Sequence, residues 1–144
     1  MKLSLYTDYS LRVLLYLGAN RGRRATMAEI AERYAISHEH LRKVVHLLGR
    51  QGYIKTYRGK SGGFELKVEP EEINIGEVIA TTEPRQPVID CSSQPCVLLF
   101  ACSLQAALNK AEQAFYDTLK TYSLADVLRN RRTLQILATD QASA

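Results

Sequence analysis

Residues 26–50 read TMAEIAERYAISHEHLRKVVHLLGR, and this stretch decides the fold class. Thr26 and Glu29 have the spacing of a capping box, in which each side chain bonds to the other residue's backbone amide. They predict a short helix to about Tyr34. After a tight turn, Ser37 caps a second helix that runs to the end of the quoted stretch. A short helix, a tight turn and a longer helix are typical of a helix-turn-helix.

The second of these helices is amphipathic. Its apolar positions recur at helical spacing and predict a face turned to the core, made of Leu41, Val44, Val45 and Leu48. The opposite face is charged, which suits either a solvated surface or a surface that reads DNA. Under the second interpretation, the first turns of the helix contact DNA bases, and the residues expected to do so are Ser37, Glu39, His40 and Lys43.

A β-hairpin is predicted directly after the helix-turn-helix. Residues 53–58 and 64–68 alternate in polarity, and the glycine-rich turn between them permits left-handed backbone conformations. A hairpin in this place makes a winged helix-turn-helix. Its tip is cationic and narrow enough for a minor groove, where negative potential is concentrated. The tip residues expected to contact DNA are Arg58, Lys60, Ser61 and Gly62.

Helices are predicted on both sides of this module. A first helix is expected from about Asp8 to Asn20, with Thr7 as its N-cap and an inward face of Leu11, Leu14, Leu15 and Gly18. Asn74 opens another short helix whose inward residues are Ile75, Val78 and Ile79. We therefore assign residues 1–82 to a winged helix-turn-helix DNA-binding domain. The predicted fold class is mainly α, of the α+β type.

Charge is distributed unevenly along the 144-residue chain, whose net charge is +4. Residues 1–68 contain 13 Lys and Arg against 5 Asp and Glu, a balance of +8, and the rest of the chain has a balance of −4. A basic half joined to an acidic half suggests that the basic half meets a polyanion. We expect that partner to be double-stranded DNA.

Other classes of protein are disfavoured by the composition. No apolar run approaches the ~18 residues of a membrane span, and the N-terminus lacks the apolar core of a signal peptide. We therefore expect a cytoplasmic protein with no membrane partner. The sequence has no Ser/His/Asp set, no phosphate-binding loop and no paired acids, so no enzyme activity and no catalytic residue is predicted.

Three cysteines, Cys91, Cys96 and Cys102, lie within twelve residues in the proline-broken segment 83–103. Thiolates suit zinc and iron–sulfur clusters. A structural zinc site needs a fourth Cys or His nearby, and the three histidines all lie on the second helix of the helix-turn-helix. A cluster would need an unusual fourth ligand, and a weakly held ligand suits a sensor. Zinc, a thiol–disulfide switch and three buried apolar cysteines are the alternatives.

A long helix is predicted from about Ser103 to Thr121. Its apolar residues recur at spacings of three and four, as in a coiled coil: Leu104, Leu108, Ala111, Phe115, Leu119 and Tyr122. This seam predicts a homodimer, with packing onto the same chain's core as the alternative. We assign residues 104–130 to the dimerisation helix and a short helix capped by Ser123, and residues 131–144 to a frayed tail.

Several features in this order resemble one known family. They are the segments LYTDYSLR (5–12), RGKSGG (58–63) and INIGEV (73–78), the three-cysteine loop, and residues 90–96 and 122–126. The combination resembles the IscR/NsrR family of bacterial winged-helix iron–sulfur transcription regulators, and is most similar to its nitric-oxide-sensing repressors. The resemblance extends over residues 1–130.

The resemblance implies a homodimeric repressor that binds an imperfect palindromic operator and releases it when nitric oxide nitrosylates an iron–sulfur cluster. Cys91, Cys96 and Cys102 match the family's cluster ligands. IscR-type members have a histidine where this chain has Gln105, which argues against an IscR-type site. The nitric-oxide sensors are thought to take an aspartate from the partner subunit's first helix, and Asp8 matches it.

Alternatives to this assignment stay open. From sequence alone, the favoured role of Asp8 is that of an acid that stabilises the first turn of its helix, and the resemblance is what favours the ligand role. Three Cys and an Asp favour a [4Fe-4S] cluster and are compatible with a [2Fe-2S] cluster. The alternative functions are a thiol-redox or zinc-containing winged-helix regulator, and a regulator of iron–sulfur cluster biogenesis from the same family.

Overall fold

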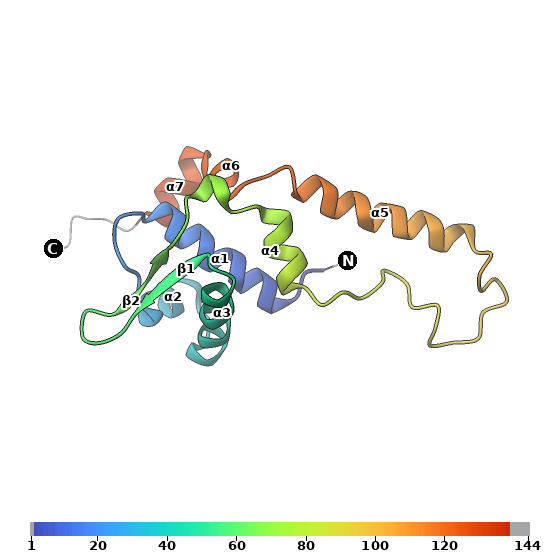
Figure 1. Ribbon diagram of the computed structural model, residues 1–144, viewed down its shortest axis with the longest axis horizontal. Helices are drawn as coiled ribbons and strands as arrows, with labels where there is room; N and C mark the ends of the chain where they lie inside the picture. The colour runs from blue at the N-terminus through green and yellow to red at the C-terminus, as the bar shows by residue number, and fades with distance from the viewer. Residues whose placement is uncertain (1, 139–144) are drawn as a thin grey trace.

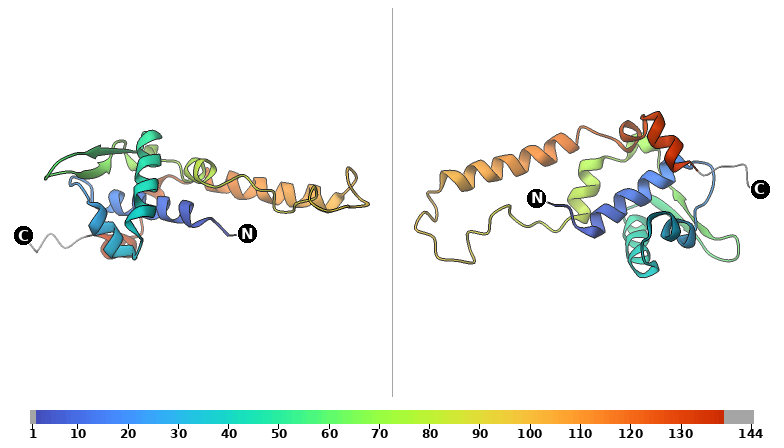
Figure 2. Two further views of the ribbon diagram at one scale, coloured as in Figure 1. Left: turned by 90° about the horizontal axis from the view of Figure 1, so that it is seen from below. Right: turned by 180° about the vertical axis from the view of Figure 1, so that it is seen from behind.

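The computed structural model describes residues 2–138 and consists of a helical body with one projecting arm (Figure 1). Figure 2 shows from two further sides that α5 and the loop before it form this arm. The elements in chain order are α1 (Leu5–Ala19), α2 (Met27–Tyr34), α3 (His38–Arg50), β1 (Ile54–Tyr57), β2 (Gly63–Leu66), the 3₁₀ turn η1 (Pro70–Glu72), α4 (Ile75–Thr82), α5 (Ser103–Leu119), α6 (Leu124–Leu128) and α7 (Arg131–Leu137).

Helix α1 lies at the centre of the body and begins earlier than the sequence predicted. Ser4, not Thr7, is its N-cap, because the Ser4 side chain accepts a hydrogen bond from the Thr7 amide at 3.2 Å. The Thr7 side chain is buried and donates instead to the Glu83 carboxylate at 2.5 Å. The predicted Thr7 cap was therefore wrong by one turn, because a distant carboxylate occupies that hydroxyl.

The predicted inward face of α1 was also only partly right. Leu14 is fully buried, but Leu11 and Leu15 are half-buried, and Val13 and Tyr16 are fully buried in their place. Helix α1 contacts α3 on one side and α4 and α6 on others. A helix covered on several sides buries more than one stripe, so a single-face pattern misjudges it.

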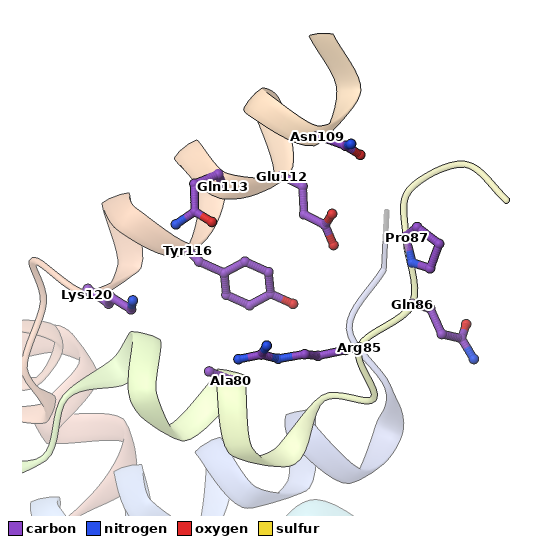
Figure 3. Close-up of a pocket in the computed structure, with 9 residues that line it drawn as sticks. All are labelled: Ala80, Arg85, Gln86, Pro87, Asn109, Glu112, Gln113, Tyr116 and Lys120. Carbon is purple, nitrogen blue, oxygen red and sulfur yellow. The ribbon is translucent and has the colours of Figure 1, made fainter. Parts of the chain in front are cut away.

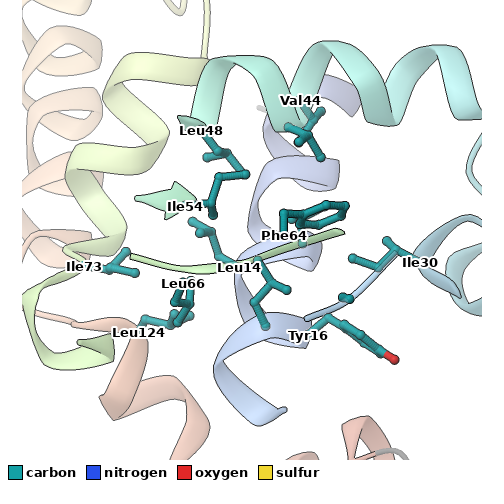
Figure 4. Close-up of a cluster of buried hydrophobic side chains, with 14 of the residues drawn as sticks. Leu14, Tyr16, Ile30, Val44, Leu48, Ile54, Phe64, Leu66, Ile73 and Leu124 are labelled. Carbon is teal, nitrogen blue, oxygen red and sulfur yellow. The ribbon is translucent and has the colours of Figure 1, made fainter. Parts of the chain in front are cut away.

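The helix-turn-helix forms as predicted. Both halves of the Thr26–Glu29 capping box are present, and the Ser37 side chain accepts from the amide of His40 at the start of α3. Figure 4 shows the core that α3 and β1 share with α1 and α6. The predicted inward face of α3 is confirmed, since its members are all buried: Leu41, Val44, Val45 and Leu48.

Strands β1 and β2 form the antiparallel wing, in which Ile54 pairs with Leu66 and Tyr57 pairs with Gly63. Ala25, just before α2, adds an isolated bridge to Phe64. Gly63 has φ of +132°, and a Cβ there would lie 2.5 Å from the Ala25 carbonyl oxygen. Only glycine fits this close crossing, which fixes the wing against the helix-turn-helix.

The C-terminal helices close the body over α1. A Cβ on Gly18 of α1 would lie 2.5 Å from the Leu128 side chain of α6, so the glycine permits a close approach of the two helices. Asn74, which caps α4, forms an isolated bridge with Ser123, which caps α6. The return from α5 is thereby tied to the start of α4.

The segment after residue 130 is not wholly frayed, contrary to our expectation. Helix α7 occupies its first seven residues, with Asn130 as N-cap and Leu137 buried. The Asn20 side chain donates to the Leu137 carbonyl oxygen at 2.9 Å, which anchors α7 to the end of α1. The predicted tail also includes residues 139–144, which lie outside the described residues.

Within residues 2–138, no helix combines the length and the apolar character that crossing a bilayer requires.

Candidate nucleic-acid interface and cysteine loop

The residues predicted to read DNA are exposed together on the first two turns of α3. Ser37, Glu39, His40 and Lys43 are all exposed. Within this group, the Lys43 ammonium lies 3.2 Å from Glu39, and the Ser37 hydroxyl lies 2.9 Å from Nδ1 of His40. The hydrogen bond from Lys43, together with its charge, lowers the pKa of Glu39. These contacts hold the polar side chains in one group on the outer surface of the helix.

The wing tip is a second exposed cationic site. Arg58, Lys60 and Ser61 are exposed, and Gly62 is half-buried in the turn. The sequence interpretation missed Arg24, whose guanidinium lies 3.5 Å from the centroid of the Tyr57 ring and donates to the Ser61 carbonyl oxygen at 3.0 Å. Arg24 therefore holds the wing tip through its contacts with Tyr57 and Ser61. No local pattern could reveal it, since its partners lie more than thirty positions away.

A basic groove of about 680 Å³ runs between α3 and the wing. Its cationic side chains come from α3 and from both sides of the hairpin, and they are Arg42, Arg50, Lys55 and Lys67, with His46 beside them. None of its lining residues is acidic. The sequence had placed the α3 members on the outer face, but it gave no sign that Lys55 and Lys67 join them, because the hairpin register brings them there.

Helix α1 contacts the same turns of α3 from the other side. The Tyr6 hydroxyl donates to the Lys43 carbonyl oxygen at 3.2 Å, and the Tyr9 ring lies 5.9 Å from the His40 ring between centroids. Both tyrosines flank Asp8 in sequence. The turn of α1 that carries Asp8 therefore contacts α3 at His40 and Lys43, two of the residues predicted to read DNA.

Asp8 itself is ion-paired within its own helix. Its carboxylate accepts from Nε of Arg12 at 2.9 Å, and the Asp8 side chain is 38% exposed. The Arg12 guanidinium lies 5.7 Å from the centroid of the Tyr34 ring, at the end of α2. Asp8 is thus accessible at the surface. Any metal ion that bound its carboxylate would have to displace Arg12.

The cysteine loop spans residues 83–102 and has no helix or strand. Cys91, Cys96 and Cys102 are free thiols, Cys96 is exposed and the other two are half-buried. Cys102 is the N-cap of α5, and its sulfur accepts from the Gln105 amide at 3.4 Å. Among the described residues, no three His, Cys, Asp or Glu side chains lie close enough together to hold a metal ion. The structure therefore does not bring Asp8 and the three cysteines together within one chain.

The donor chemistry nevertheless fits an iron–sulfur cluster. Three accessible thiols in a loop with few backbone hydrogen bonds can close around a group of iron atoms, since thiolates are the usual ligands of such clusters. The three histidines do not join them: His38, His40 and His46 are exposed on α3, as the sequence predicted. A fourth ligand of such a cluster would have to be a residue other than these histidines.

The arm exposes apolar side chains that the body does not cover. Helix α5 has no buried residue. Val97 and Phe100 in the loop are almost fully exposed, and Leu104 is 60% exposed. The alternative that α5 packs on its own core holds only at its C-terminal end, where Tyr116 and Leu119 contact the core.

A cleft of about 450 Å³ separates α5 from α4 and the root of the cysteine loop (Figure 3). Arg85 and Tyr116 point into it from opposite walls, as Figure 3 shows, and Glu112 and Lys120 line the α5 side. The cleft separates most of α5 from the body, and the seam residue Leu104 on the arm remains 60% exposed.

Comparison with known proteins agrees with this architecture. A family model described as "Rrf2: Iron-dependent Transcriptional regulator" matches residues 3–130. The chain belongs to the Rrf2 family of transcriptional regulators. Members of the Rrf2 family are regulators and not enzymes.

Two relatives show how far the similarity to other Rrf2 regulators extends. The HTH-type transcriptional regulator NsrR of Bacillus subtilis (strain 168) is 43% identical over 141 residues, which cover 95% of this chain and 97% of the relative. NsrR of Bacillus licheniformis is 44% identical over 135 residues, which cover 91% of this chain and 94% of the relative.

Solved structures of Rrf2 regulators share the fold. The oxidized form of Staphylococcus aureus CymR has a TM-score of 0.74 at 25% identity, covering 90% of this chain and 97% of that one. T. potens IscR has a TM-score of 0.70 at 24% identity, covering 90% of this chain and 88% of that one. The second likeness establishes the fold alone.

Proposed function

We propose that this chain is a transcriptional repressor that senses nitric oxide through an iron–sulfur cluster and releases its operators when the cluster is nitrosylated. One observation carries the proposal: a loop with three free thiols follows a winged helix-turn-helix, in a chain 43% identical along nearly its whole length to a regulator named NsrR. Clusters held by thiolates react with small gases at their iron atoms, which is the chemistry that the bound group would supply.

DNA binding is assigned to two exposed surfaces of the body. The turns of α3 with Ser37, Glu39, His40 and Lys43 would read base edges in the major groove. The wing tip with Arg58, Lys60, Ser61 and Gly62 would enter the adjacent minor groove. Between these surfaces, the basic groove of α3 and the wing has the charge to take up backbone phosphates.

A homodimer is proposed from the arm. Along α5 of one chain, Leu104 is exposed and Leu108 and Phe115 are only half-buried. Such an incompletely covered apolar stripe marks an interaction surface, because exposed apolar patches are rare in monomers. A second copy would cover Leu104, Leu108 and Phe115 with the same residues of its own α5. Two copies of α3 would then face the two halves of an imperfect palindrome.

The cluster ligands are proposed as Cys91, Cys96 and Cys102 of one chain with Asp8 of the partner subunit. A [4Fe-4S] cluster is favoured over a [2Fe-2S] cluster. Asp8 can take this role because its carboxylate is accessible, and Arg12 would have to release it. Its neighbours Tyr6 and Tyr9 touch α3, so a shift of this turn reaches the DNA-reading residues directly.

Anaerobic purification tests the proposal. We expect a brown protein that contains iron and acid-labile sulfide and binds its operator. Adding nitric oxide should bleach the visible absorption of the cluster and dissociate the protein from its operator. The same protein without nitric oxide is the control. A colourless protein with stoichiometric zinc would favour the zinc-containing alternative, and a protein with neither metal would favour a thiol switch or plain DNA binding.

Two substitutions test the DNA contacts. Lys43→Ala should change base preference at one or two operator positions, at a cost of about 1–3 kcal/mol each, because a base contact is lost.

Arg58→Ala should weaken binding to all sequences and lower the salt dependence by about one phosphate contact. Binding curves on operator and random DNA at several salt concentrations measure both effects.

Arg132→Ala is the charge-matched control for these variants. Arg132 is exposed on α7, which lies on the opposite side of the body from α3 and the wing (Figure 1). We expect this variant to bind like the unaltered protein. If Lys43→Ala and Arg58→Ala also bind like it, α3 and the wing are not the DNA interface.

A further inference from the structure

Glu83 joins two segments that lie far apart in the sequence. It is the C-cap of α4 and the first residue of the cysteine loop. Its two carboxylate oxygens each accept from the Ser4 amide at 3.0 Å, and one also accepts from the Ser4 hydroxyl at 3.0 Å and from the Thr7 hydroxyl at 2.5 Å. The root of the loop is thereby bound to the first turn of α1.

These hydrogen bonds engage both oxygens of the Glu83 carboxylate. Partial burial of Glu83 opposes its ionisation, but the bonds from Thr7 and Ser4 outweigh this effect and hold the pKa of the carboxyl below its ordinary value. A carboxylate at the N-terminal end of α1 is also favoured by the helix dipole. Glu83 is therefore a charged anchor for the helix start, with its oxygens already engaged.

The anchored turn is the one that carries Asp8. The Asp8 amide donates to the Ser4 carbonyl oxygen at 3.0 Å, and Thr7 precedes Asp8 directly. The position of the Asp8 backbone is thus set by the same two residues that Glu83 binds. Movement at the root of the loop reaches Asp8 through short hydrogen bonds, without any flexible segment in between.

We propose that Glu83 is a positioning residue that holds the turn carrying Asp8 against the root of the same chain's cysteine loop. The inference rests on the proposed function, since it bears on sensing only if the cysteines and Asp8 hold a cluster. Because Asp8 is proposed to serve the partner's cluster, each Glu83 links the loop of one chain to the cluster of the other. A change in one loop then reaches both cluster sites.

Glu83→Gln tests this role, because it keeps the size of the side chain and removes its charge. We expect the variant to assemble a cluster on its three cysteines, with a visible spectrum altered in the same direction as that of Asp8→Ala. Operator affinity of the cluster-loaded protein should fall about 10-fold. In the cluster-free protein, backbone amides in the first turn of α1 should exchange hydrogen faster than in the unaltered chain.

Glu69→Gln is the matched control. It also removes a glutamate charge, and it breaks an exposed ion pair with Arg21 at 2.6 Å, at a site outside the loop and outside the start of α1. Thr7→Val removes the hydrogen bond from the Thr7 hydroxyl to the Glu83 carboxylate, the shortest bond between α1 and Glu83, and should reproduce the Glu83→Gln spectrum. It also decides the question if Glu83→Gln does not fold.

The outcomes separate this inference from the proposed function. If Glu83→Gln and Thr7→Val match Glu69→Gln in spectrum, operator affinity and amide exchange, Glu83 is not a positioning residue, although the chain can still be a nitric oxide sensor. If the unaltered protein holds no cluster, the proposed function fails. In that case amide exchange alone tests whether Glu83 holds the first turn of α1, and unchanged exchange in that turn overturns the inference.

Discussion

Cys96→Ala should abolish cluster binding and repression while leaving the body of the protein intact. Cys96 is exposed, and no residue of the loop from 83 to 102 is buried. Removing its sulfur therefore costs little folding free energy, within about 0.5 kcal/mol for an exposed site. Helical content and dimerisation should persist, since the apolar stripe of α5 is independent of this thiol.

The functional loss should be large by comparison. Two thiolates cannot replace three, so iron and sulfide should be absent from the purified variant, and operator affinity should fall by roughly 10³-fold towards non-specific binding. Metal analysis, circular dichroism, size-exclusion chromatography and operator binding measure the four properties. Gln94→Ala, an exposed change in the same loop, should leave all of them unaltered.

An opposite result would identify the loop as structural. A Cys96→Ala protein that unfolds or becomes monomeric would mean that the thiol supports the fold or the dimer. The zinc-containing alternative would then be favoured, because structural zinc contributes folding free energy directly.

Local sequence signals predicted the body where one interaction dominates. Helix α3 has one face on the core and one in solvent, so its spacing identified all four buried residues. The Thr26–Glu29 capping box involves neighbours only, and it forms as predicted. The glycine-rich turn likewise placed the wing, and the structure adds that Gly63 is required by the crossing of Ala25.

Long-range contacts decided the features that the sequence could not indicate. Ser4 and Thr7 are both competent N-caps, and the choice between them follows from Glu83, 76 positions beyond Thr7. Helix α7 begins with two arginines and resembles a frayed tail, but the buried side chain of Leu137 and the Asn20 hydrogen bond fix it to α1. Such pairs have no common local pattern.

The candidate site divides in the same way. Residue type and spacing located the three cysteines and the exposed face of α3, because both are local. The support of the wing by Arg24 and the meeting of Lys55 and Lys67 with α3 depend on the hairpin register. The proposed ligand set shared between two subunits is harder still to predict, since neither chain alone would contain it, and Asp8 pairs with Arg12 in the single chain.

Asp8→Ala should separate cluster assembly from operator binding. Three cysteines remain, so we expect a cluster to form, but with an altered visible spectrum because the fourth ligand changes. A carboxylate is a poor match for soft iron compared with a thiolate, and it should exchange readily and leave one iron accessible to a small gas. Operator binding should weaken, because the turn that carries Asp8 contacts, through Tyr6 and Tyr9, the α3 residues that are proposed to read DNA.

Mixed dimers show which chain supplies the ligand. One subunit carries Asp8→Ala, and the other has Cys91, Cys96 and Cys102 replaced. If ligation crosses the interface, the cysteines of the first chain meet Asp8 of the second, and one cluster with the normal spectrum forms in each dimer. If ligation stays within a chain, neither chain has a complete site, and no normal cluster forms.

An Asp8→Ala homodimer with an unaltered spectrum, nitric oxide response and DNA affinity would remove Asp8 from the cluster. Its role would then be the one seen in the single chain: an acid in the first turn of α1 that is stabilised by the helix dipole and pairs with Arg12. Arg12→Ala distinguishes the two roles further. If Asp8 is a cluster ligand, it should bind the cluster more readily once Arg12 is removed. If Asp8 is purely structural, Arg12→Ala should leave the cluster unchanged and lower only the stability of α1.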